Sequence, residues 1–300
     1  MTIRKTKAAF AVALAAMTTS AAQAQRDFSA VEIETTEVAD GIYMLTGAGG
    51  NMGLLVGDDG AILIDDQFAP LTEKIAAAIA DVTDRPVKFL FNTHHHFDHT
   101  GGNENFGNAG ALIIAHDNVR KWLSGGSVSD FGETPPAPEV AWPAVTFSDT
   151  VTFHMNGQDI HVFHPENAHT DGDAIVFFKT ANVIHMGDVY FAGAFPYIDV
   201  NGGGSVTGAI AALEGAAAMI DDDTVVIPGH NELATKSDMV ETIAMLRDVS
   251  ARVQALIDDG LDEEAAIAAD PLADLSDKWG AGFIDSAQMT RIAYRSLSAS

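Results

Sequence analysis

NTHHHFDHTGG, residues 92–102, places four histidines and one aspartate within six consecutive positions, directly before two glycines. The whole chain has only 11 histidines in 300 residues, so this local density needs a chemical explanation. Imidazole nitrogens and carboxylate oxygens are the ligands that borderline divalent metals prefer, and zinc is the commonest of these metals. The stretch therefore predicts a metal site.

The spacing within the cluster predicts how its side chains share metal ions. The preceding run VKFLF, residues 87–91, is typical of a buried strand that ends at the cluster. His94 and His96 are two positions apart, so in an extended chain both side chains point the same way and reach one ion. Asp98 and His99 lie past the bend, where we expect them to serve a second ion.

Three further candidate ligands each follow a strand-like run elsewhere in the chain. His169 comes after DIHVFH, Asp188 closes VIHMGD, and His230 closes VVIPGH. Ligands delivered from several strand ends to one sheet edge are how α/β proteins commonly build a site. Taken singly, these residues are also explained as capping or turn residues. Taken with the cluster, they are interpreted as its missing partners.

The order of these residues along the chain resembles a known family. His94-x-His96-x-Asp98-His99, His169, Asp188 in Met-Gly-Asp and His230 in Pro-Gly-His are similar to the five motifs of the metallo-β-lactamase superfamily, from Val31 to Leu233. The resemblance implies an α/β fold, an αββα sandwich, with a dinuclear zinc site at the sheet edge. It also implies that His94, His96 and His169 hold the first zinc, that Asp98, His99 and His230 hold the second, and that Asp188 bridges both.

Strand-like and helix-like patterns alternate in both halves of the chain. Amphipathic helices are predicted around Leu71, Ile75 and Ile79, and from Met239 to Leu256. Such alternation favours two sheets between outer layers of helices. Residues 124–149 are rich in glycine, serine and proline, and we expect them to form a long connection between the halves.

Residues 1–24 have the composition of a signal peptide. Arg4, Lys5 and Lys7 precede an apolar stretch too short to span a bilayer, and Ala22-Gln23-Ala24 is a small-x-small cleavage signal. We expect cleavage near Ala24 and a periplasmic or secreted location. Residues 25–300 are then expected to form a single metallo-β-lactamase-like domain with C-terminal helices.

The charge and the cysteine content exclude several classes of function. The formal net charge is −26, and so acidic a surface repels nucleic-acid phosphates and does not attract anionic lipid heads. The chain has no cysteine, which excludes a disulfide framework, a thiolate nucleophile and a thiolate metal ligand. The expected partner is a small-molecule substrate, with no nucleic acid and no membrane, and no pattern specifies an oligomeric state.

A pair of metal ions predicts hydrolysis of an activated carbonyl, as found in a β-lactam, a lactone or a thioester. Two close cations lower the pKa of a shared water to about 7 and stabilise the oxyanion that hydroxide attack forms. Asp98 is the predicted catalytic residue, because it is near enough to shuttle the proton of the water. Nitrogen and oxygen donors also suit iron or manganese, which remain alternatives to two Zn²⁺ ions.

The export signal favours a periplasmic β-lactamase, with a role in antibiotic resistance, because the targets of β-lactams lie in that compartment. Two departures from the best-known lactamases keep alternatives open. Asp188 stands where those enzymes have a cysteine, and no lysine follows it in Asp-Val-Tyr-Phe-Ala. A lactonase or a glyoxalase II-like thioesterase is the alternative within the family. A non-catalytic periplasmic binding or sulfur-carrier protein is the alternative from another class.

Two loops are expected to shape the substrate pocket. TGAGGNMG, residues 46–53, is a glycine-rich hairpin tip of the kind that covers a bound molecule. In residues 190–205, Tyr190, Phe191, Phe195 and Tyr197 are expected to form an apolar wall, and Asn201 and Ser205 are expected to donate hydrogen bonds to the substrate. Packing in the core is the alternative explanation for the aromatic side chains.

Overall fold

The computed structural model describes residues 27–130 and 132–298. The chain divides into two compact units, Met1–Ala30 and Val31–Ser300. The predicted signal peptide and its cleavage site lie outside the described residues, and all the elements named below belong to Val31–Ser300. Within the described ranges, no helix is both long and apolar enough to cross a membrane.

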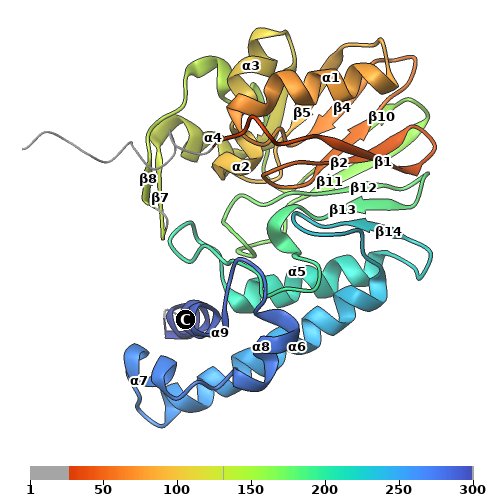
Figure 1. Ribbon diagram of the computed structural model, residues 1–300. Helices are drawn as coiled ribbons and strands as arrows, with labels where there is room; N and C mark the ends of the chain where they lie inside the picture. The colour runs from red at the N-terminus through yellow and green to blue at the C-terminus, as the bar shows by residue number, and fades with distance from the viewer. Residues whose placement is uncertain (1–26, 131, 299–300) are drawn as a thin grey trace, which may run out of the picture. The chain divides into compact units, whose positions relative to one another are not determined.

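Two β-sheets lie face to face at the centre of Val31–Ser300 (Figure 1). The first sheet has the order β1 (Glu34–Ala39), β2 (Ile42–Thr46), β3 (Met52–Leu55), β4 (Ala61–Ile64), β5 (Val87–Phe91), β6 (Leu112–His116) and β9 (Val145–Phe147). The second has the order β10 (Thr150–Met155), β11 (Gln158–Phe163), β12 (Ile175–Phe178), β13 (Val183–His185) and β14 (Val225–Ile227). Both sheets are mixed: β4, β5, β6 and β9 run parallel in the first, and β13 and β14 in the second.

The inner faces of the two sheets form one apolar core. Ile62 and Ile64 of β4 and Phe91 of β5 pack with Val162 of β11 and Val176 of β12, and all five side chains are buried. Successive side chains of a strand point to opposite faces, so this alternation leaves the outer faces of both sheets to be covered by helices.

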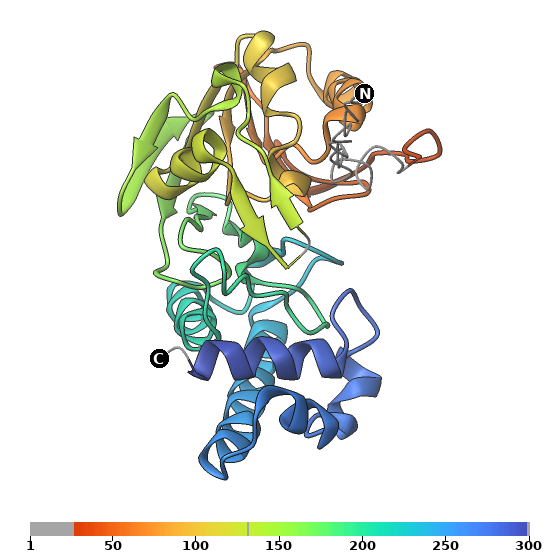
Figure 2. The same cartoon turned by 90° about the vertical axis from the view of Figure 1, so that its left-hand side faces the viewer.

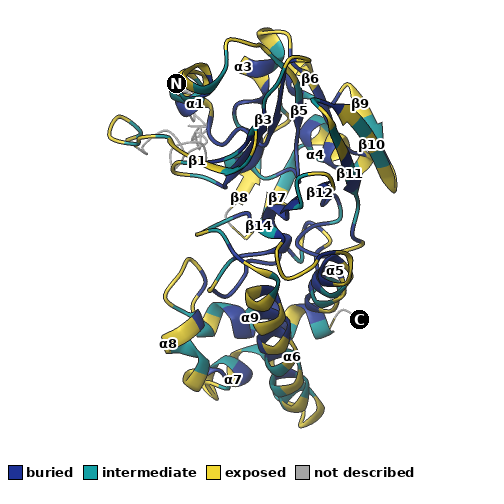
Figure 3. Cartoon of the chain, turned by 90° about the vertical axis from the view of Figure 1, so that its right-hand side faces the viewer, coloured by how far each residue is buried: buried dark blue, intermediate teal, exposed yellow. Residues whose placement is uncertain are grey.

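Helices cover both outer faces and complete the αββα sandwich expected from the sequence (Figure 3). Those on the first sheet are η2 (Ala69–Leu71), α1 (Thr72–Val82), α2 (Phe97–Thr100), α3 (Asn103–Asn108) and α4 (Asp117–Gly125). On the second sheet, α5 (Val206–Met219) and α6 (Lys236–Asp258) pack against Phe177, Ile184 and Val226. Beyond them lie α7 (Glu263–Ala268), η5 (Ala273–Leu275), α8 (Ser276–Trp279) and α9 (Ser286–Ser298), which crosses α6 (Figure 2).

The long C-terminal helix predicted from periodicity is α6. It begins after Thr235, whose hydroxyl accepts from the backbone N–H of Asp238, while the Asp238 carboxylate accepts from the backbone N–H of Thr235. This capping box satisfies two backbone groups that the helix itself leaves unpaired. The predicted apolar face, including Met239, Leu246 and Val253, is buried.

The connection expected over residues 124–149 contains short strands that the sequence pattern did not predict. β7 (Ser127–Ser129) and β8 (Gly132–Thr134) form a small two-stranded sheet, followed by η3 (Glu139–Ala141). β9 then joins the first sheet, where Val145 pairs with Ile114 and Phe147 pairs with His116. These strands are only three residues long, so the prolines and glycines around them dominate the sequence pattern.

Candidate metal centre

The seven predicted ligands come together where strands of both sheets end. The first four lie after β5, in the loop that enters α2 and in α2 itself: His94, His96, Asp98 and His99. The other three lie after β11, in η4 (Gly187–Val189) after β13, and after β14: His169, Asp188 and His230. The chain thus brings together side chains that are separated by as many as 136 positions in sequence, from 94 to 230.

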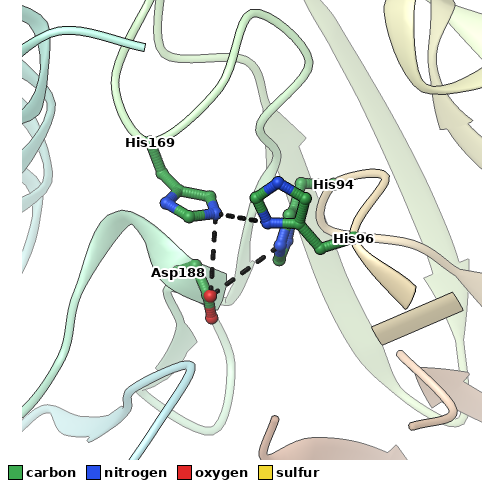
Figure 4. Close-up of side chains that lie close together, drawn as sticks. All are labelled: His94, His96, His169 and Asp188. Carbon is green, nitrogen blue, oxygen red and sulfur yellow. Dashed lines mark hydrogen bonds and ion pairs between the residues drawn. The ribbon is translucent and has the colours of Figure 1, made fainter. Parts of the chain in front are cut away.

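His94, His96, His169 and Asp188 form a first group, in which one ligand atom from each lies within 4.8 Å of the others. Figure 4 shows the three imidazoles and the carboxylate pointing toward one another. His94 Nε2 lies 3.8 Å and His169 Nε2 lies 3.6 Å from Asp188 Oδ2. These are the four side chains that the resemblance assigned to the first zinc and the bridge.

Asp98, His99 and His230 form a second group, again with ligand atoms within 4.8 Å of one another. His230 Nε2 lies 3.5 Å from Asp98 Oδ2 and 3.4 Å from His99 Nε2. Asp188 also reaches this group, since its Oδ1 lies 3.0 Å from His99 Nε2 and its Oδ2 lies 3.3 Å from His230 Nε2. Asp188 therefore occupies the position between the groups that a bridging ligand requires; its metal ligation stays a prediction.

Two histidines of the first group hydrogen-bond outward through the ring nitrogen that faces away from the group. His96 Nε2 donates to Asp199 Oδ2 (2.9 Å), and His169 Nδ1 donates to the carbonyl oxygen of Tyr197 (2.8 Å). Such partners orient the two rings and direct their other nitrogens, His96 Nδ1 and His169 Nε2, into the group.

A single buried carboxylate, Asp65, orients one histidine of each group. His99 Nδ1 donates to Asp65 Oδ2 (2.7 Å). His94 Nδ1 donates to Thr93 Oγ1 (3.0 Å), which in turn donates to Asp65 Oδ2 (2.7 Å). Asp65 follows β4 directly and is fully buried, so the position of both rings is tied to the first sheet.

The inward-facing atoms fit a bound cation. His96 Nδ1 and His169 Nε2 face each other at 3.0 Å, within hydrogen-bond distance. His94 Nε2 is buried and has no hydrogen-bond partner. A cation bound here would supply the partner that His94 Nε2 lacks, because buried polar atoms require a partner. The donor set of imidazoles and carboxylates suits zinc and related divalent ions.

The pKa values of the buried histidines differ between the two groups: they are lowered in the first group and raised in the second. Burial lowers the pKa of His169 to about 4 and holds the pKa of His94 well below its usual range, so both rings are neutral. Burial would raise the pKa of Asp188, but the His99 and His230 imidazoles hold it well below its usual range. Burial likewise opposes the charge on His99, yet Asp188 and other carboxylates raise its pKa. A metal ion bound by His99 would therefore compete with the proton on that ring.

Glycines allow the backbone to approach the ligands closely. A Cβ at Gly50 would lie 2.0 Å from His99 Cε1, and a Cβ at Gly229 would lie 2.1 Å from Asp188 Oδ1. The backbone N–H of Gly50 also donates to the carbonyl oxygen of Asp98 (3.1 Å). The glycine-rich tip predicted to cover a bound molecule thus lies directly on the second group.

Comparison with known proteins agrees with this geometry. The sequence model described as the Metallo-beta-lactamase superfamily matches residues 45–230, which contain all seven candidate ligands. The chain belongs to the metallo-β-lactamase superfamily. Its C-terminal helices, from α6 onward, lie outside the matched segment.

Relatives of this superfamily member include proteins named as hydrolases. A probable metallo-hydrolase, YqgX of Bacillus subtilis (strain 168), is 26% identical over 185 residues, 60% of this chain and 84% of the relative. A hydroxyacylglutathione hydrolase of Polaromonas sp. (strain JS666) is 28% identical over 206 residues, 66% of this chain and 67% of the relative. The solved structure of a metallo-β-lactamase from Pontibacter korlensis shares the fold, with a TM-score of 0.61 and 21% identity over 72% of this chain and all of that chain (100%). The superfamily member described here is a metallo-hydrolase.

The structure corrects two of the predicted substrate contacts. Tyr190 and Phe195 are 0% and 1% exposed and pack in the apolar core under α5 and α6, so they form no wall of a substrate pocket. An aromatic residue in a loop beside a site points either outward or into the core, and the loop sequence did not distinguish the two. Asn201 is exposed and its amide donates to Asp130 Oδ1 (3.2 Å), so its contact with a substrate stays a prediction.

Two of the aromatic residues expected in the wall of the pocket, Phe191 and Tyr197, lie against histidines of the metal centre. The ring of Phe191 stacks on His230, with centroids 4.8 Å apart and planes at 18°. The ring of Tyr197 lies 5.9 Å from His96 between centroids. Asp65 and Asp199 were not predicted as part of the site, although both are acidic residues that follow short apolar runs, ILI and YI. That position after an apolar run is the signal they share with the predicted ligands.

Gly50→Ala is expected to reduce hydrolysis about 10- to 100-fold, the range typical for disturbing the surroundings of a metal ligand. The new methyl group has no room beside His99 and must displace that ring or the turn itself. Gly215→Ala is the matched control, because a Cβ there meets nothing within 4 Å and the residue lies in helix α5. Equal rates and equal metal content in the two variants would contradict the close packing of Gly50 on His99.

Proposed function

We propose that this metallo-hydrolase opens an activated carbonyl bond, with a β-lactam ring as the first candidate substrate. The observation that carries the proposal is the position of Asp188 between two complete ligand groups, beside a partly exposed Asp98. When bound, two divalent cations polarise the carbonyl oxygen and make a water molecule acidic enough to yield hydroxide near neutral pH. We propose two Zn²⁺ ions, one at each group.

In the proposed reaction, one side chain transfers a proton and others orient the histidines. The Asp98 carboxylate is 23% exposed and the Asp188 carboxylate is 5% exposed, so Asp98 is the acid group that a water or substrate reaches. Asp98 is positioned to accept the proton of the attacking water and to return it to the leaving group. Asp65, Asp199 and the Tyr197 carbonyl hold the histidines in the orientation that this requires.

A lactone or a thioester is the second candidate substrate. No lysine or arginine follows Asp188 up to Ser205, so this loop supplies no cation for the carboxylate of a β-lactam drug. A hydroxyacylglutathione hydrolase is also among the relatives. A periplasmic location, which would expose the protein to β-lactams, is part of the proposal and rests on the composition of residues 1–24.

A hydrolysis panel on zinc-loaded protein tests the proposal. Carbapenems, cephalosporins, homoserine lactones and lactoylglutathione are compared by kcat/KM, and we expect turnover of at least one class. Asp98→Asn is measured alongside, and its rate on that substrate is expected to fall about 100-fold or more because the amide cannot accept the proton. Absence of turnover for every class would favour the non-catalytic binding protein. An unchanged rate in Asp98→Asn would exclude Asp98 as the proton acceptor.

A further inference from the structure

Gln67 is a buried polar residue that has no place in the ligand groups. It lies after β4, two positions from Asp65, and is fully buried. Its backbone φ is 54°, in the left-handed region that residues other than glycine seldom adopt. A buried amide in this conformation persists only where its surroundings hold it there.

The side chain of Gln67 makes three hydrogen bonds, all to the glycine-rich turn over residues 47–50. Oε1 accepts from the backbone N–H groups of Ala48 and Gly49, each at 3.2 Å. Nε2 donates to the carbonyl oxygen of Gly50 at 2.7 Å. Both polar atoms of the amide are therefore directed at one turn, which joins β2 to β3.

The same turn lies against the second ligand group. The N–H of Gly50 donates to the carbonyl oxygen of Asp98 (3.1 Å), and a Cβ at Gly49 would lie 2.6 Å from that same oxygen. Gly50 also lies directly against the ring of His99. The position of the turn thus determines how Asp98 and His99 are packed.

We propose that Gln67 is a positioning residue that clamps the turn over residues 47–50 onto Asp98 and His99. The clamp acts through the backbone of the turn, and it keeps the second group in the arrangement that holds a metal ion. The inference rests on the proposed function only for its kinetic readout, since the position of the turn and metal retention are measured without a substrate.

Gln67→Met tests the clamp, because methionine keeps the length of the side chain and removes both hydrogen-bonding atoms. Asn156→Leu is the matched control. Asn156 also has a positive φ (50°), and its amide also holds a loop, accepting from the N–H of Asp59 and donating to the carbonyl oxygen of Gly60. It lies before β11, at the opposite end of that strand from His169. Both variants are expected to lose stability, so stability alone does not decide the test.

The deciding measurements are made on the zinc-loaded full chain. In Gln67→Met we expect hydrogen exchange at Ala48, Gly49 and Gly50 to be about tenfold faster, and zinc transfer to a colorimetric chelator to be about tenfold faster. On a substrate identified by the panel, kcat is expected to fall about tenfold with KM nearly unchanged, because Asp98 is displaced. Asn156→Leu is expected to leave all three unchanged.

Equal exchange and equal zinc release in the two variants would overturn the clamp, whatever happens to stability. A wild-type chain without hydrolytic activity would overturn the proposed function and leave the exchange and zinc measurements to decide the clamp. Gln67→Glu is the second variant if Gln67→Met does not fold. It keeps the acceptor for Ala48 and Gly49 but not the donor to Gly50, and exchange at these residues is again expected to be faster than in Asn156→Leu.

Discussion

Asp188→Ala is expected to abolish metal binding and hydrolysis together, with kcat/KM falling on the order of 10³-fold or more. The Asp188 carboxylate lies 3.0 to 3.8 Å from a ring nitrogen of four histidines, two in each group: His94, His169, His99 and His230. Its removal leaves these nitrogens without the negative charge that both groups share. The measurement is zinc content by elemental analysis, followed by the rate on the best substrate.

Asp238→Ala is the control for this substitution. It removes a carboxylate from the capping box of α6, away from the metal centre, and is expected to cost about 1 kcal/mol of stability while leaving zinc content and rate unchanged. An Asp188→Ala protein that still bound zinc and hydrolysed substrate at the wild-type rate would show that the two groups do not depend on a shared carboxylate.

Removal of metal by a chelator is expected to lower the melting temperature by about 10 °C or more. A ligand present at a thousandfold excess over its Kd stabilises the folded state by about 4 kcal/mol per site, and 1 kcal/mol corresponds to about 2–4 °C for a domain of this size. Without a metal, the buried Nε2 of His94 is left without a hydrogen-bond partner. Thermal unfolding of loaded and chelator-treated protein checks the expectation, and added zinc should restore the higher value.

The decrease in melting temperature caused by the chelator is expected to become smaller at low pH. Asp188 and the neighbouring carboxylates raise the pKa of His99 against the opposing effect of burial. In the metal-free protein, the protonated ring therefore contributes stability that is fully present below the ordinary histidine pKa and is lost as the pH rises through the raised one. Because a metal ion competes with that proton, the melting temperatures of the metal-loaded and metal-free proteins are expected to approach each other as the pH falls. Asp188→Ala protein should show no shift on chelation at any pH, and a shift of wild-type size would contradict this account.

The candidate ligands were predictable because each stands at the end of a strand-like run. Four of them are neighbours in sequence, and the turn from β5 into α2 is enough to bring His94, His96, Asp98 and His99 together. The αββα sandwich followed from alternating strand and helix patterns, which depend on local periodicity. The family match over residues 45–230 confirms the resemblance to the metallo-β-lactamase superfamily and the fold class that it implied.

The residues around the ligands depend on contacts that no local pattern records. Asp65 accepts a hydrogen bond from His99 only because β4 lies beside β5. Asp199 accepts one from His96, from which it is separated by 103 positions of sequence. Tyr190 and Phe195 were assigned to the wrong side of their loop for the same reason, since only the packing of α5 and α6 decides which side is the core. The short strands β7, β8 and β9 lack enough residues to establish an alternating pattern.

Asp65 gives the centre one further property. The Asp65 carboxylate at the end of β4 orients one histidine of each group, so if each group held an ion, the first sheet would set the separation of the two ions more than the ionic radius would. Zinc, manganese or iron bound in these groups would then differ in reactivity but meet the same spacing of ligands.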